Sequence, residues 1–129
     1  MIGKVITQLL KASDPLKALV PELSWYPYVA NEDTPLPLII YTINDLDPEY
    51  NKDGWVADDC VFSIVTFSED YANIQEIVAQ VRKALELKKG IYGTINIHRI
   101  ELTGQAEGFN IAEGVFLNRS TFSVRIRGY

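Results

Sequence analysis

The segment that most constrains the fold is a long apolar strand that leads directly into an amphipathic helix. Residues 56–68, VADDCVFSIVTFS, carry apolar side chains on both faces from Cys60 onward. This pattern is typical of a central strand that is covered on both sides. A polar stretch, residues 68–70, then opens a helix whose apolar residues repeat at helical spacing as far as Leu85. The chain therefore needs a sheet with a helix beside it.

Shorter elements surround this unit. Two short helices are predicted at residues 2–10 and 15–20, the second after a capping serine and before a proline stop. Further strands are predicted at residues 25–29, 38–43, 95–103 and 115–127. Because Pro27 has no N–H to donate, the first of these strands is expected to be irregular or to lie at a sheet edge.

The remaining segments are polar or rich in glycine and predict loops. Residues 44–54, NDLDPEYNKDG, form the expected acidic loop. Residues 104–114, GQAEGFNIAEG, form an expected glycine-containing loop. Gly90 is the expected C-terminal cap of the main helix.

The order of these elements predicts an α+β fold. We expect a mostly antiparallel β-sheet with one long helix packed across a face and short N-terminal helices. At 129 residues, the chain fits a single domain that spans residues 1–129.

Composition excludes several classes of function. A net charge of −5 and a pI near 4.8 argue against a nucleic-acid binder, which concentrates lysine and arginine. One cysteine cannot form an internal disulfide, and no apolar run approaches the roughly 18 residues that span a bilayer. We therefore expect an intracellular protein without a membrane partner.

The acidic loop has the beginning of a calcium-binding pattern. Asp45, Asp47 and Glu49 alternate as in such a loop, but Tyr50 stands where a glycine is needed and Val56 where a glutamate is needed. A solvated acidic loop is the better interpretation, and no metal or other cofactor is predicted.

Cys60 and His98 are the only candidates for a nucleophile and its base. Both lie on predicted strands, but Cys60 has no cation nearby in the sequence to lower the pKa of its thiol. A buried structural cysteine and an ordinary strand histidine are favoured. No catalytic residue is predicted, and the protein is expected not to be an enzyme.

Aromatic and arginine side chains leave two interpretations open. Trp25, Tyr26 and Trp55 fall near strand ends, where they can pack at the core or edge or lie in a subunit interface. Arg125 and Arg127 alternate on the last strand, which suits a solvated face or a charged contact across an interface.

The order of short sequence motifs resembles a known family over nearly the whole chain. LKALV follows the first helix, WYPYV and LPLIIYTI follow in turn, a long strand runs directly into the main helix, and RSTFSVRIR closes the chain. This layout is similar to that of small tail-completion proteins of long-tailed bacteriophages, which are related to tail terminators and tail-to-head joining proteins.

The resemblance implies a non-enzymatic structural protein of a phage or prophage tail. Its subunits would form a ring, a hexamer in this family, that terminates the tail tube or joins the tail to the head. The implied partners are further copies of the chain, the tail tube protein and the head-connector protein, while DNA passes through without specific binding. The implied location is the virion, after assembly in the cytoplasm of the bacterial host.

Candidate interface or lumen residues follow from combining these interpretations. Pro35 and Pro37 preset an extended backbone that would direct the acidic loop away from the sheet. Six copies at −5 would carry about −30, a field that repels DNA if the acids line the channel. The candidates are Trp25, Tyr26, Asp45, Asp47, Glu49, Tyr50, Asp53, Trp55, Arg125 and Arg127.

One alternative to a virion component comes from a different class. The chain would then be a stand-alone cytoplasmic ligand- or protein-binding α+β domain that uses the loop side of its sheet.

Overall fold

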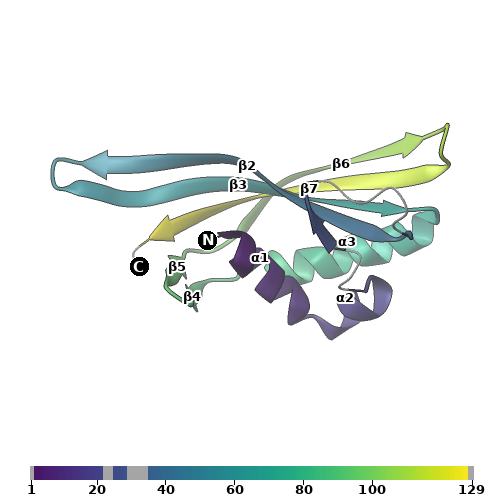
Figure 1. Cartoon of the computed structure of the whole chain (residues 1–129), viewed down its shortest axis with the longest axis horizontal. Helices are drawn as coiled ribbons and strands as arrows, with labels where there is room; N and C mark the ends of the chain where they lie inside the picture. The colour runs from purple at the N-terminus through teal and green to yellow at the C-terminus, as the bar shows by residue number, and fades with distance from the viewer. Residues whose placement is uncertain (1, 22–24, 29–34, 128–129) are drawn as a thin grey trace.

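One long twisted sheet with helices on one side makes up the molecule (Figure 1). The computed structural model describes residues 2–21, 25–28 and 35–127. In these ranges the elements are α1 (Ile2–Lys11), α2 (Asp14–Leu19), β1 (Trp25–Pro27), β2 (Leu38–Asn51), β3 (Gly54–Ser68), α3 (Tyr71–Leu85), β4 (Gly90–Tyr92), β5 (Ile95–Ile97), β6 (Glu101–Asn110) and β7 (Val115–Arg127). The sheet order is β1-β2-β3-β7-β5-β4, with β6 also paired to β7. Among the strands of the described ranges, β1 and β2 are the one pair that runs parallel.

The expected α+β fold with one long helix across a face is wrong. Strands take up 52% of the described residues and form a curled half-barrel sheet, and the helices are short. A strand rises about 3.3 Å per residue and a helix about 1.5 Å. With 15 residues each, α3 is therefore less than half as long as β3. The β2–β3 end of the sheet projects beyond the helices, whereas the β6–β7 end contacts α3 through Phe116 and Tyr71 (Figure 1).

This error arose because two predicted loops are strands. Residues 44–51 continue β2, and residues 104–110 continue β6. Each stretch forms one half of a long hairpin with β3 or β7. Residues 44–51 are all exposed, as are residues 104–110 apart from Gly108, so both stretches lack the apolar alternation by which strands are recognised.

The core lies between the middle of the sheet and the helices. Phe62 of β3 and Phe122 of β7 are fully buried and stack with their ring centroids 5.4 Å apart. The helices cover them with their apolar faces. The buried helix residues are Ile2, Val5, Ile6, Leu9, Leu10, Leu16, Ile74, Ile77, Val81, Ala84 and Leu85. The predicted apolar faces of the first and main helices are thus confirmed, as is the central position of β3 between β2 and β7.

Helix and strand ends follow the sequence in most places. Ser13 caps α2 by accepting a hydrogen bond from Leu16 N at 3.3 Å, and Asp70 caps α3 by accepting one from Ala72 N at 3.1 Å. The expected cap at Gly90 is wrong. The main helix ends at Leu85, the chain turns at Leu87 with φ 64°, and Gly90 begins β4.

Two predicted strands differ from those observed. β1 lies at the sheet edge, as Pro27 indicated, but the end of the predicted strand, residue 29, lies outside the described residues. The strand expected at residues 95–103 is divided: β5 ends at Ile97, and β6 begins at Glu101. His98 N still donates to Arg125 O at 2.8 Å between them.

Candidate functional site

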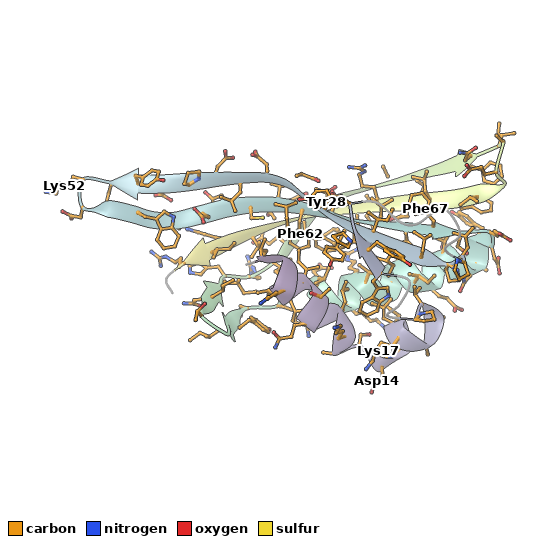
Figure 2. All side chains as sticks on the ribbon, viewed as in Figure 1. Asp14, Lys17, Tyr28, Lys52, Phe62 and Phe67 are labelled. Carbon is orange, nitrogen blue, oxygen red and sulfur yellow. The ribbon has the colours of Figure 1, made fainter. Side chains whose placement is uncertain are left out.

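The hairpin of residues 44–59 projects from one end of the sheet, and we call it the acidic arm. Figure 2 shows Lys52 at its tip, far from Phe62 in the centre of the sheet. Asn51 pairs with Gly54 across the turn, and the Asn51 side chain accepts a hydrogen bond from Asp53 N at 2.8 Å. Gly54 has φ 122°, a conformation that suits glycine at such a turn.

The acidic arm carries the whole net charge of the chain. It has six acids and one lysine, a net charge of −5, and the rest of the sequence balances to zero. Successive strand residues face opposite sides, so Asp45, Asp47 and Glu49 share the face turned away from the helices. Among the described residues no group of acids, histidines and cysteines is arranged to hold a metal ion.

Asp47 experiences charge repulsion from neighbouring carboxylates. Asp45, two residues away on the same face, raises the pKa of Asp47 by charge repulsion and by a side-chain hydrogen bond. Slight burial and the charge of Asp59, directly opposite on β3, raise the pKa further. A cation brought to this face would relieve the repulsion.

One arginine ties the base of the acidic arm to β7. Arg125 bonds to Glu49 through Nη2 and to both oxygens of Asp59 through Nη1, at 3.2 and 3.4 Å. This network raises the pKa of Arg125, chiefly through the hydrogen bond with Glu49. Arg127 follows on the same face of β7 and is exposed. The structure thus joins two candidates that the sequence treated separately, Glu49 of the acidic arm and Arg125 of β7.

The aromatic candidates divide between the core and the acidic arm. Trp25 is buried in the core cluster, and Tyr26 is half-buried beside it on β1. Tyr50 and Trp55 face each other across the acidic arm, on the helix side, and Tyr50 is 67% exposed. Trp55 Nε1 donates to Asp58 Oδ1 at 2.8 Å. Trp25 therefore follows the core-packing interpretation, whereas the other three remain interface candidates.

The hairpin at the opposite end of the sheet is built differently. We call residues 101–119 the aromatic arm (Figure 1). The ring centroid of Phe116 lies 4.6 Å from that of Phe109 and 5.2 Å from that of Tyr71 on α3. Tyr71 also donates to Glu107 Oε2 at 3.1 Å. The sequence did not predict this cluster, because residues 104–114 were expected to form a loop.

A second missed surface is a groove between α1 and the end of α3, which we call the lysine groove. It has a volume of about 400 Å³ and is lined by Gln8, Leu9, Ala12, Ser13, Lys83, Ala84, Lys88 and Tyr92. Two lysines and no carboxylate are among these described lining residues. The sequence showed only a basic helix end, which the helix dipole explains without a groove.

A larger open cleft of about 1010 Å³ holds both residues of the possible catalytic pair. Cys60 is 1% exposed, and burial, with the charges of Asp58 and Asp45, raises the pKa of its thiol to about 11. His98 is exposed, and no hydrogen bond joins it to Cys60 among the described residues. A thiol with this pKa stays protonated at neutral pH, which argues against a nucleophile.

Comparison with known proteins identifies the family. The model of the family described as tail completion protein gp17 matches residues 4–127. The chain belongs to this family. It is a structural component of a phage tail, as the resemblance implied, and its place is in the virion.

The fold of this tail completion protein also occurs in a solved virion. A chain of the structure titled "Virion of native gene transfer agent (GTA) particle" matches with a TM-score of 0.74 and 21% identity, over 95% of this chain and 92% of that chain. A search among curated proteins gives no match. None of the helices in the described ranges is long and apolar enough to cross a membrane.

Proposed function

We propose that this tail completion protein forms a closed ring at the end of the tail tube, where it terminates the tube or joins the tail to the head. The family match over residues 4–127 carries the proposal. The hexameric state comes from the family resemblance. The partners are further copies of the chain, the tail tube protein and the head-connector protein.

The shape of the subunit supports ring formation. Two arms leave the sheet in opposite directions, and their exposed surfaces differ in charge and apolar content (Figure 1). Unlike surfaces at two ends favour head-to-tail contacts, which close into a ring when the rotation per subunit divides a full turn. A symmetric dimer would instead need one self-complementary surface.

The protein acts by binding, without catalysis. The only cysteine has a protonated thiol at neutral pH, and the only histidine is exposed and forms no hydrogen bond to it among the described residues. The net charge of −5 per subunit gives a hexamer about −30, which weakens adhesion of DNA that passes through the ring.

Electron microscopy of tails tests the proposal. Tail tubes purified from a phage lacking this gene are mixed with the protein and compared with tubes in buffer. We expect a ring on one end of each tube and, by native mass spectrometry of the detached ring, six copies of the chain. Tubes whose ends stay bare at saturating protein would overturn the proposal.

A further inference from the structure

We propose that the acidic arm of one subunit docks in the lysine groove of the next copy of this chain. The inference rests on the proposed ring and names the contact that closes it. It concerns two surfaces of the same molecule that lie too far apart to meet within one subunit.

The lysine groove presents two cations that form no ion pair with any residue in the described ranges. Lys83 and Lys88 line it, both are exposed, and neither forms an ion pair with a described residue. Leu9, Ala84 and Tyr92 add apolar surface to its lining. The nearest acid on the same stretch of chain, Glu86, is already paired with Arg82. The groove therefore suits a segment that is both acidic and apolar.

The acidic arm has both properties. Asp45, Asp47 and Asp53 form no ion pair with any residue in the described ranges. Leu46 and Tyr50 are 42% and 67% exposed on the other face of the same hairpin. Exposed apolar side chains on a projecting hairpin can be buried against a partner. A two-stranded hairpin of this kind gains stability when a partner covers it.

Charge complementarity identifies the partner as a second copy. The acidic arm holds a net charge of −5, and the groove lining holds two lysines without a carboxylate. In Figure 1 the arm points away from α1 and α3, so a subunit cannot fill its own groove. Two lysines are few for DNA, whose binding proteins usually neutralise about six or more phosphates. The contact joins unlike surfaces and therefore continues from subunit to subunit.

The repulsion on the acidic arm favours such a contact. Asp45 lies on the same face as Asp47, and its charge disfavours the ionised form of Asp47, as the raised pKa of Asp47 reports. A lysine placed against this face turns the repulsion into attraction.

Charge-reversal variants test the contact. Asp45→Lys with Asp47→Lys changes the acidic arm, and Lys83→Glu with Lys88→Glu changes the groove; all four side chains are exposed. Oligomerisation is measured by sedimentation velocity at about 0.15 M salt, with tail tubes added if the free protein is monomeric. Arg99→Glu with Arg119→Glu is the matched control, since both arginines are exposed and lie outside the groove. Circular dichroism checks that each variant folds.

The expected result is reciprocal. Each reversal alone raises the dissociation constant about tenfold or more, the four changes combined in one chain restore it, and the control leaves it within about twofold. Two reversed variants that assemble like the wild type would overturn the arm-to-groove contact and leave the ring proposal standing. A wild type that neither oligomerises nor binds tubes would overturn the ring and this contact with it. Loss of DNA binding by the groove variant, with assembly unchanged, would assign the groove to nucleic acid instead.

Discussion

The two arms of the sheet have the same backbone plan and opposite means of support. The aromatic arm is held against α3 by the Tyr71–Phe116–Phe109 contacts and by the Tyr71–Glu107 hydrogen bond. The acidic arm extends past the helices and is held at its base by the ion pairs of Arg125. Apolar packing holds the aromatic arm in place. Ion pairs, with which water and dissolved ions compete, hold the acidic arm.

This difference indicates which arm can adapt to a partner. Apolar packing survives changes in salt and pH, while exposed ion pairs are weak and screened. The charges are also unequal: the acidic arm carries −5, whereas the aromatic arm has three acids and one arginine, a net charge of −2. The aromatic arm belongs to the folded body of the subunit, and the acidic arm is the element with freedom to engage a neighbour.

The largest expected effect is on the packing of the aromatic arm. Phe116→Ala removes a half-buried ring that contacts both Phe109 and Tyr71, and should lower the free energy of unfolding by about 2 kcal/mol. Tyr50→Ala, the matched change on the acidic arm, should alter it by less than about 0.5 kcal/mol because the ring is exposed. Urea unfolding measures both. Equal losses would remove the contrast between the arms.

Arg125→Met should loosen the acidic arm without unfolding the protein. The change leaves Glu49 and Asp59 without their shared cation, close to two other acids. Amide hydrogen exchange in residues 45–59 should become about tenfold faster, while exchange in the aromatic arm stays unchanged. Arg119→Met, the same change elsewhere on β7, is the control.

The reactivity of Cys60 offers a second measure of how far the acidic arm loosens in the Arg125→Met variant. It lies opposite Leu46 at the base of the acidic arm and is buried, with a thiol pKa raised to about 11. At pH 8 the thiol is therefore protonated as well as covered, and alkylation should be slow in the wild type. Arg125→Met should speed alkylation and Phe116→Ala should not. Similar rates in both variants would mean that the arms open together.

The smallest expected effect concerns the repulsion among the acids. Because the pKa of Asp47 is raised in the folded protein, the ionised group destabilises the fold at neutral pH, and protonation relieves this as pH falls through that pKa. Asp47→Asn should therefore raise the Tm slightly at about pH 7, by an amount that shrinks toward about pH 4. Asp45→Asn removes the largest cause of the shift and should act in the same direction. A Tm difference independent of pH would contradict this account.

The sequence predicted those parts of the fold that have a buried face. The stripe at Ile74, Ile77 and Val81 predicted α3, and the alternation of Phe122, Val124 and Ile126 predicted β7. It did not predict the outer halves of β2 and β6, because nearly all residues of these halves are exposed and no periodic apolar pattern results. The share of residues in strands is larger than the sequence predicted for that reason.

The sequence predicted which residue types could form a site, but not which of them contact one another in the fold. The acids and Arg125 were chosen from composition and alternation, yet the bond between Arg125 and Glu49 joins residues 76 positions apart. The lysine groove depends on how α1 crosses α3, which a single sequence does not specify. The family resemblance, in contrast, used the order of elements along the chain and was confirmed over residues 4–127.

The position of β7 at the end of the strand order along the chain affects when the sheet of a subunit can form. β3, β5 and β6 all pair with β7 and all precede it in the chain. During synthesis β3, β5 and β6 therefore keep an open edge until residues 115–127 leave the ribosome, so the centre of the sheet closes late and through long-range pairing.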